Sequence, residues 1–374
     1  MLLKLTILPG DGIGPEVIEG AICVLKAVAH SFHHELDLAY SDVGGAALLS
    51  SKEPLPLQTL QTCLSSTAVL LGAVGAPAFD DLPGHLRPEA GLLKLRRQLG
   101  AFANLRPAVF YPSLAATSPL RPEVADHTDI LIVRELLSGL YFGEPRLIQG
   151  RAGDRDATNT MRYREPEIER VARVAFELAQ SRRRKLTSVD KANVLECSRL
   201  WRDVVTRVAR DFPDVTLAHM YVDSAAMALV MHPAQFDVVL TENMFGDILS
   251  DEVGGIVGSL GLLASASIGG PIGLYEPVHG SAPNIAGKGI ANPLGAILSV
   301  ALLLRYSFRL EKEAACIEWA VGRVLERGDR TADLAPQGAA KPLTTTEMAH
   351  KVAESALELA SEGGLQVTSH EQSA

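Results

Sequence analysis

TENMFGDILSDE, residues Thr241–Glu252, joins a predicted strand to a predicted helix and carries two acidic side chains at helical spacing. The preceding segment 236–240, FDVVL, is short, apolar and β-branched, which predicts a buried strand. Apolar residues then recur at helical spacing from 248 to 257. Asp247 and Asp251 are four residues apart on this helix, so their carboxylates face the same way, about one turn apart.

Two interpretations of this acidic pair remain open at this point. Like charges at this spacing repel unless a cation joins them, and hard oxygen ligands suit Mg²⁺ or Mn²⁺. The alternative is a solvated acidic face near a helix N-terminus, where acidic side chains are favoured in any case. Taken alone, the pair favours the solvated face, and the remainder of the chain has to decide between the two.

Length and composition describe an ordinary globular protein. At 374 residues the chain is long enough for two domains, or for one large domain with an insertion. Hydrophobic residues make up 47% and charged residues 21%. The net charge of −9 argues against an extended nucleic-acid or anionic-membrane surface, although a local arginine cluster could still bind a small polyanion.

The cysteines and apolar runs predict a cytoplasmic location. The four cysteines are scattered without a CxxC pattern, so neither a disulfide framework nor a zinc site is indicated. The N-terminal MLLKLTILPGDG has an apolar run too short for a signal peptide. The longest apolar run, 296–304, covers about half a membrane span. We therefore expect no membrane partner.

Strand and helix patterns alternate along the chain and predict an α/β protein with a largely parallel sheet. Predicted strands at 2–8, 68–75, 130–133 and 186–189 alternate with predicted helices. Glycines at 10, 12 and 14 are spaced GxGxG and are followed by Pro15. A dinucleotide-binding Rossmann loop needs GxGxxG opening directly into its helix, so we interpret this segment as a tight strand-to-helix turn.

Four other segments are predicted to be irregular or exposed. Residues 150–160, GRAGDRDATNT, indicate a loop or projecting arm. The basic run 182–185 is interpreted as a solvated helix cap. Residues 277–293 hold three prolines and three glycines, which predicts a long, functional loop. The polar tail from about 361 is predicted to be disordered.

Several motifs, taken together, resemble the β-decarboxylating dehydrogenases of the isocitrate/isopropylmalate dehydrogenase family. The resemblance runs from LPGDGIGPEV at 8–17 to the helix that ends near Tyr306. The other motifs that carry it, in chain order, are GLLKLR, FANLRP, LIVREL-x₃-YFGEPR, SVDKANVLE, MYVD, NMFGDILSD, EPVHGSAP and IAGKGIANP. The resemblance implies an isopropylmalate/isocitrate dehydrogenase-like open α/β sheet fold with two domains, distinct from the Rossmann fold.

The resemblance also implies that the two domains have different roles. Residues 1–101 and 258–374 would form a discontinuous cofactor-binding domain, and 102–257 a central domain with the dimer interface and the arm. The implied reaction oxidises a 2-hydroxy acid with a nicotinamide and then releases CO₂ from the resulting 3-carboxylate. The implied partners are the substrate and a second copy of the chain, with active sites shared between the two subunits.

The residues that match the family's catalytic positions come from several motifs. Tyr141 would protonate the enolate carbon, and Lys191 from the partner subunit would act as, or through, the general base. Asp247 and Asp251 would hold Mg²⁺ or Mn²⁺, and Asp223 of the partner subunit would add a third carboxylate and contact the substrate. The substrate carboxylates would be clamped by guanidinium groups, which suit bidentate recognition; these belong to Arg96, Arg106 and Arg134. For Arg96 and Arg106 alone, surface ion pairs are the alternative.

Substrate choice would rest on one helix and one residue of the partner subunit. The matching positions are Glu89, Leu92, Leu93 and Val194. Two leucines suit a branched alkyl group, whereas a buried γ-carboxylate left unpaired would cost several kcal/mol, on the order expected for a buried charge. The expected substrate is therefore 3-isopropylmalate. Isocitrate, homoisocitrate and tartrate remain alternatives, as does a non-catalytic regulatory paralogue.

The cofactor implied is NAD. The matching positions are Glu276, near the nicotinamide ribose, and the adenosine-binding set His279, Gly280, Ser281, Ala282, Asn284, Ile285 and Asn292. NAD-using relatives usually carry aspartate where this chain has Asn284, whose amide does not repel a 2′-phosphate. The Lys-Tyr pair of NADP users is absent, because Ile285 follows Asn284. We expect NAD preference with weakened discrimination. Glu242 stands where relatives often have a small residue, and its role is open.

Overall fold

The computed structural model describes residues 1–335 and 341–362, so the predicted disordered tail beyond Glu362 lies outside the described residues. The chain forms two compact units. The first comprises Met1–Ala101, Phe110–Pro122 and the chain from Gly254 onward, and the second comprises Phe102–Val109 and Glu123–Val253. Residues 110–122 and 254–257, which the predicted boundaries put in the central domain, cluster with the first unit. The cofactor and dimer roles of the domains stay predictions.

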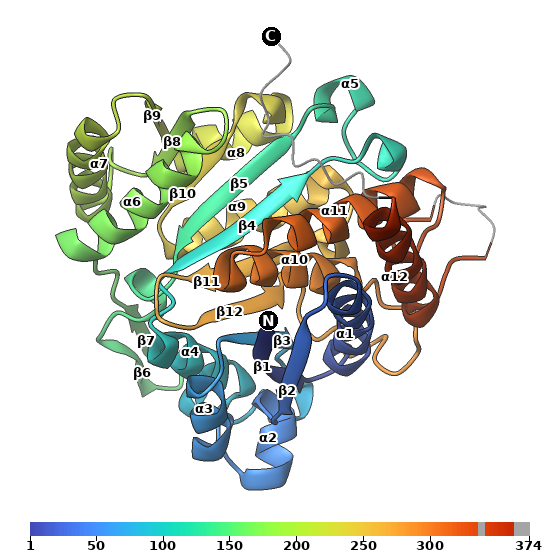
Figure 1. Cartoon of the computed structure of the whole chain (residues 1–374). Coiled ribbons are helices and arrows are strands. Elements are labelled where there is room, and N and C mark those ends of the chain that lie inside the picture. The colour runs from blue at the N-terminus through green and yellow to red at the C-terminus, as the bar shows by residue number, and fades with distance from the viewer. Residues whose placement is uncertain (336–340, 363–374) are drawn as a thin grey trace. The chain divides into compact units, whose positions relative to one another are not determined.

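The first unit contains a mostly parallel set of strands in the order β2-β1-β3-β12-β11 (Figure 1). Its strands are β1 (Leu2–Gly10), β2 (Glu35–Tyr40), β3 (Ala68–Ala73), β11 (Ala264–Ile268) and β12 (Gly273–Pro277). Three pairings are parallel, and only β11 runs antiparallel to β12. The predicted strand at 68–75 is completely buried as β3, as its unbroken apolar run requires.

Helices cover the strands of the first unit. They are α1 (Gly14–Ser31), α2 (Gly44–Ser51), α3 (Leu57–Leu64), α4 (Pro88–Leu99), α10 (Leu294–Phe308), α11 (Glu311–Glu326) and α12 (Thr345–Ser361). Helices α1, α10, α11 and α12 pack on one another, while α2 packs on α4 (Figure 1). Helix α10 is apolar almost all round and is buried, which is what such a pattern predicts.

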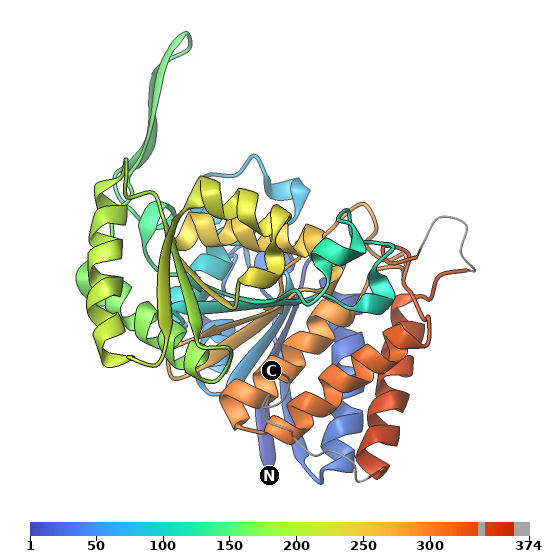
Figure 2. The ribbon, with the colours of Figure 1, turned by 90° about the horizontal axis from the view of Figure 1, so that it is seen from above.

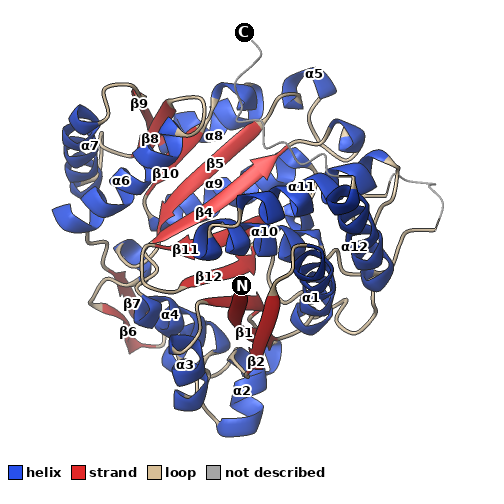
Figure 3. Cartoon of the chain, in the orientation of Figure 1, coloured by secondary structure: helices blue, strands red, loops and turns tan. Residues whose placement is uncertain are grey.

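Five strands of the second unit lie side by side in the order β4-β5-β10-β8-β9, and among these five only the β4–β5 pair is antiparallel. The five strands are β4 (Ala103–Val109), β5 (Asp129–Glu135), β8 (Lys185–Asp190), β9 (Thr216–Tyr221) and β10 (Val238–Thr241). The helices of this unit are α6 (Glu165–Gln180), α7 (Glu196–Val208), α8 (Val222–Met231) and most of α9 (Asn243–Val257), whose residues from 254 onward belong to the first unit. The short α5 (Pro122–Ala125) lies at the unit boundary. Figure 3 shows this alternation of strands and helices. The predicted α/β fold is confirmed.

A two-stranded hairpin forms the predicted arm. Strands β6 (Arg146–Arg151) and β7 (Asp154–Asn159) pair only with each other, and nearly all their residues are exposed. Figure 2 shows the hairpin extending away from the body of its unit. The expected irregular arm is therefore a β-hairpin. The loop predicted at 277–293 is confirmed, because no helix or strand lies between β12 and α10.

The basic run at 182–185 differs from its prediction as a solvated cap. Arg182 donates to the buried carboxylate of Asp237 at 2.8 Å and pairs with Asp129 at 2.9 Å. Arg183 donates to the backbone carbonyls of Asp129 and Phe236. These arginines tie the end of α6 to the beginnings of β5 and β10, because a buried carboxylate at 237 needs cationic partners.

Candidate active site

The predicted acidic pair lies on α9 as expected, and two buried arginines point at it. Arg106 Nη1 lies 3.2 Å from Asp247 Oδ1 and 3.6 Å from Asp251 Oδ1. Arg134, on β5, donates to Asp247 through Nη1. The arginine side chains are 8% and 2% exposed, whereas those of Asp247 and Asp251 are 34% and 57% exposed. Buried cations therefore face carboxylates that remain open to solvent.

Tyr141 joins the same cluster. It lies in a short 3₁₀ turn, η4 (Gly139–Tyr141), and its hydroxyl donates to Asp247 Oδ2 at 2.8 Å. The Arg134 guanidinium lies 5.5 Å from the centre of the Tyr141 ring. Burial, and then the charge of Asp247, raise the pKa of Tyr141. The phenol is thus protonated and available as an acid near neutral pH.

The chemistry of the acidic pair fits a divalent cation. Both groups are carboxylates, and hard oxygen donors are the ligands preferred by Mg²⁺ and Mn²⁺. Burial and the charge of Asp247 raise the pKa of Asp251, while Arg106 opposes the rise. Within the described ranges of a single chain, no three His, Cys, Asp or Glu side chains come together as a metal-binding group. Asp223 of the same chain therefore does not complete the site.

Lys191 and Asp223 form a separate pair. Lys191 follows β8, Asp223 lies in the first turn of α8, and Lys191 Nζ donates to Asp223 Oδ1 at 2.6 Å. This contact lowers the pKa of Asp223. Arg202 links the C-terminal ends of β8 and β9. It donates two 2.8 Å hydrogen bonds to Asp190, the last residue of β8, and its guanidinium lies 5.1 Å from the ring centre of Tyr221, the last residue of β9.

In the first unit, α4 presents the predicted specificity residues. Leu92 and Leu93 are partly exposed, and Leu92 also packs against the core cluster around Leu95 and Leu99. Arg96 is buried, and its Nη2 donates to Glu276 Oε1 at 2.7 Å. The residue predicted for the substrate clamp thus pairs with the one predicted near the nicotinamide ribose. Arg96 Nε is buried without a hydrogen-bond partner.

The predicted cofactor loop lies against the glycine turn after β1. Gly12 has φ +59°, and a Cβ there would lie 2.0 Å from the Ser281 carbonyl oxygen. Ile13 N donates to that same oxygen at 2.8 Å. A Cβ on Gly75 would lie 3.2 Å from Ser281 Oγ and 3.3 Å from Glu89 Oε1. Glu89 on α4 and Ser281 therefore meet beside Gly75.

The remaining predicted cofactor residues differ in their exposure. Asn284 and Gly280 are exposed, and Ala282 and Ile285 are partly exposed. Burial lowers the pKa of His279, whose Nε2 is buried without a partner. Asn292 is buried, and its amide donates to Asp333 at 3.0 Å and accepts from Leu294 N at 3.0 Å. Val194, in the second unit, is 63% exposed.

Four supporting residues were missed by the sequence interpretation. Asn104 and Ser250 accept from Arg106 at 2.8 and 2.6 Å. Asn243 accepts from Arg134 Nε and Nη2 at 3.1 and 2.7 Å. Asp333 holds Asn292. Three of them lie within the FANLRP and NMFGDILSD motifs, close in sequence to residues that were predicted for the site. Their proximity to those residues could have identified them as candidates.

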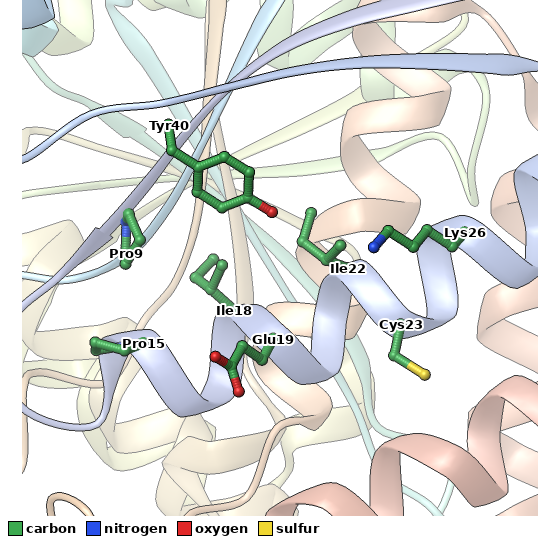
Figure 4. Close-up of a pocket in the computed structure, with 8 residues that line it drawn as sticks. All are labelled: Pro9, Pro15, Ile18, Glu19, Ile22, Cys23, Lys26 and Tyr40. Carbon is green, nitrogen blue, oxygen red and sulfur yellow. The ribbon is translucent and has the colours of Figure 1, made fainter.

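A pocket unrelated to these residues lies in the first unit. It has a volume of about 490 Å³ and is lined by residues of β1, α1 and β2, including Ile18, Ile22 and Tyr40 (Figure 4). None of the predicted site residues lines it. In the described ranges, no helix has both the length and the apolar character needed to cross a bilayer.

Comparison with known proteins defines the class. The family model described as isocitrate/isopropylmalate dehydrogenase matches residues 4–352. The chain therefore belongs to the isocitrate/isopropylmalate dehydrogenase family, a family of metal-dependent dehydrogenases, and it is an oxidoreductase.

Comparison with individual relatives shows which enzymes of the family the chain is similar to. The chain is 56% identical to a 3-isopropylmalate dehydrogenase of Geobacillus kaustophilus, covering 93% of this chain and 94% of the relative. It is 52% identical to the 3-isopropylmalate dehydrogenase of Aquifex aeolicus, covering 94% and 96%. The crystal structure of isocitrate dehydrogenase from Methylococcus capsulatus matches with a TM-score of 0.85 at 34% identity, covering 95% and 99%.

Proposed function

We propose that this chain is a 3-isopropylmalate dehydrogenase of leucine biosynthesis. It would oxidise the 2-hydroxyl of 3-isopropylmalate with NAD and release CO₂ to give 4-methyl-2-oxopentanoate. The observation that carries the chemistry is the convergence of Arg106, Arg134 and Tyr141 on Asp247. The substrate is supported by relatives of that name at 52–57% identity over at least nine tenths of the chain.

Binding begins with the two carboxylates of the substrate. The guanidiniums of Arg106 and Arg134 are buried and fixed by Asn104, Ser250 and Asn243, so little side-chain entropy is lost when they bind an anion. The nicotinamide, when bound, supplies the hydride acceptor. A divalent ion at Asp247 and Asp251, with Asp223 of a second subunit, would supply Lewis acidity at the substrate hydroxyl.

Two proton transfers frame the reaction. A base removes the hydroxyl proton as the 2-oxo acid forms, and we assign this role to Lys191 of the second subunit. Loss of CO₂ then leaves an electron pair on C3, which must take up a proton to complete the product. The Tyr141 hydroxyl is the acid assigned to that step, since it is protonated and lies in the cluster around Asp247.

A homodimer is part of the proposal. Helix α8 exposes Met227, Val230 and Met231 at positions i, i+3 and i+4, with 66%, 39% and 56% of each residue exposed. Ile248 on α9 is 59% exposed and Ile148 on the arm is 65% exposed. Apolar side chains on an exposed helix face favour burial against another protein surface. Since Asp223 lies on α8, that face would carry Lys191 and Asp223 toward a second subunit.

The test is a substrate panel. Purified protein with Mg²⁺ should reduce NAD with 3-isopropylmalate, with kcat/KM roughly a hundredfold or more above that for isocitrate, homoisocitrate, tartrate or malate. The charged side group of isocitrate and homoisocitrate is poorly tolerated against Leu92 and Leu93, and tartrate and malate lack an alkyl group to bury there. Preference for isocitrate or homoisocitrate would reassign the substrate. Reduction of neither NAD nor NADP with any member of the panel would favour the non-catalytic paralogue instead.

A further inference from the structure

Glu242 is a buried carboxylate at the beginning of α9 that has no place in the mechanism above. It is 3% exposed and directly precedes the first residue of the helix. Its Oε1 accepts from Phe245 N at 2.7 Å, and its Oε2 accepts from Met244 N at 3.1 Å. The side chain thus satisfies two of the backbone N–H groups that every helix N-terminus leaves unpaired.

Tyr163 completes the arrangement. Its hydroxyl donates to Glu242 Oε2 at 3.1 Å and accepts from Asn243 N at 2.9 Å, so the N–H group of the first helical residue is also satisfied. The residue is 6% exposed, and its ring meets the Trp201 ring edge-on, with centroids 5.6 Å apart. Burial and the charge of Glu242 raise the pKa of Tyr163, which keeps the hydroxyl as a donor.

The same hydroxyl sets the turn that carries Tyr141. Gly139 has φ +75°, and a Cβ there would lie 2.2 Å from Tyr163 Oη. Gly139 N donates to the carbonyl of Arg162, the residue before Tyr163. Asn243 then joins both sides, because its side chain accepts from Arg134 and donates to the carbonyl of Ser138. Helix α9, Arg134 and the turn before η4 therefore meet at Asn243, whose backbone N–H donates to the Tyr163 hydroxyl.

We propose that Glu242 and Tyr163 are a pair of positioning residues that hold the first turn of α9 and η4 in one register. In that register the Tyr141 hydroxyl and the Arg134 guanidinium both reach Asp247. The pair touches neither substrate nor metal and acts through the placement of Asp247 and Asp251. The inference rests on the proposed function, since it assigns the acidic pair to a divalent cation.

The experiment measures Mn²⁺ binding to the full-length protein without turnover. Free Mn²⁺ is followed by electron paramagnetic resonance in the presence of 3-isopropylmalate and without NAD. Glu242→Gln keeps the size of the side chain but offers one acceptor oxygen, and Tyr163→Phe keeps the contact with Trp201 but removes the hydroxyl. We expect each variant to raise the Kd for Mn²⁺ about tenfold, which matches the order of one lost buried hydrogen bond to a backbone N–H.

Three further variants separate positioning from a general loss of stability. Glu242→Asp can still cap the helix with a carboxylate and should recover most of the Mn²⁺ affinity. The double variant should bind Mn²⁺ no more weakly than the weaker single variant, because the two side chains act as a unit. Glu347→Gln removes a carboxylate that caps α12 in the first unit, and it should lower the thermal midpoint without changing the Kd for Mn²⁺.

Steady-state kinetics give a second readout. The KM for the metal should rise in Glu242→Gln and Tyr163→Phe, while kcat at saturating metal changes much less. Both variants binding Mn²⁺ within twofold of the wild type, at whatever thermal stability, would overturn the positioning role. If one variant does not fold, the other decides. A wild-type protein that binds no Mn²⁺ with the substrate would instead overturn the proposed function itself, and the positioning role with it.

Discussion

Asn284 is the residue at which this chain departs from the pattern expected of NAD users. It is exposed, in a loop turn closed by the hydrogen bond from Ile285 N to Ala282 O at 3.1 Å. An aspartate there would accept from both ribose hydroxyls and would repel a 2′-phosphate. An asparagine accepts through a single oxygen and carries no charge. The selectivity of the proposed enzyme for NAD should therefore be lower than an aspartate would give.

Replacing Asn284 with aspartate tests this interpretation. The ratio of kcat/KM for NAD to kcat/KM for NADP should rise at least tenfold, about 1.4 kcal/mol, because a like charge against a phosphate is costly. Asn284→Ala adds no charge and serves as the control, with the ratio changing by less than threefold. Should the wild type use NADP as well as NAD, the NAD assignment fails, whatever the variants do.

At the scale of elements, the turn after β5 depends on Glu135, which is fully buried beside Arg134. Glu135 accepts from the backbone N–H groups of Leu137 and Ser138 at 3.1 and 2.8 Å, and Arg170 Nη2 lies 3.3 Å away. Burial raises the pKa of Glu135 from 4.5 to about 7, against the opposing effect of these donors. The folded state thus holds a proton on Glu135 that the unfolded state releases at lower pH.

This difference fixes the sign of a pH effect on stability. Between pH 4.5 and about 7 the folded state binds more protons at Glu135, so its contribution to the free energy of unfolding falls as pH rises. A pKa rise of this size corresponds to roughly 3 kcal/mol. Glu135→Gln is neutral throughout, so its stability relative to the wild type should improve by up to about that amount from pH 5 to pH 8.

Urea unfolding of both proteins at pH 5 and pH 8 measures the change. Glu123→Gln, at an exposed glutamate of the same unit, is the matched control, and its difference from the wild type should stay constant. A constant difference for Glu135→Gln as well would mean that Glu135 has the same pKa folded and unfolded. The prediction that buried Glu135 lowers the free energy of unfolding at neutral pH would then be wrong.

The helices and strands that could be predicted from the sequence are those in which the spacing of apolar residues matches the face that is buried in the structure. The strand at 236–240 and the helix after it were expected from apolar periodicity and occur as β10 and α9. The hairpin β6–β7 was expected only as an arm, because residues exposed on both faces carry no alternating apolar signal. Its two strands pair through backbone hydrogen bonds. These bonds do not depend on particular side chains, so the pairing could not be predicted from the sequence.

In the candidate site, too, contacts between residues that are distant in the sequence could not be predicted. Motif spacing brought Asp247 and Asp251 to one face of a helix, which the structure confirms. It could not show that Arg96 pairs with Glu276, 180 residues further along the chain. Nor could it give Glu242 a role, because its partner Tyr163 lies in a different segment and is joined to it only by the fold.

At the scale of the whole molecule, the predicted catalytic residues of the second unit fall into two groups. One group surrounds Asp247, and the other is the pair Lys191–Asp223. In the described part of one chain, no third acidic, histidine or cysteine side chain joins Asp247 and Asp251 as a metal group. A proposed active site that needs both groups would therefore draw them from two subunits, and symmetry would place two such sites in a dimer.

Mixed dimers test this arrangement. Lys191→Ala and Asp247→Ala homodimers should each be inactive, but a dimer of one subunit of each kind rebuilds one intact site and loses the other. Dimers isolated through two different affinity tags should therefore show about half of the wild-type kcat per dimer, since one of two symmetric sites works. Lys191→Ala combined with Asp223→Ala is the matched control: both residues belong to the same group, so neither site is complete and activity should not return. Recovery in both mixtures, or in neither, would show that the active site is not divided between subunits in this way.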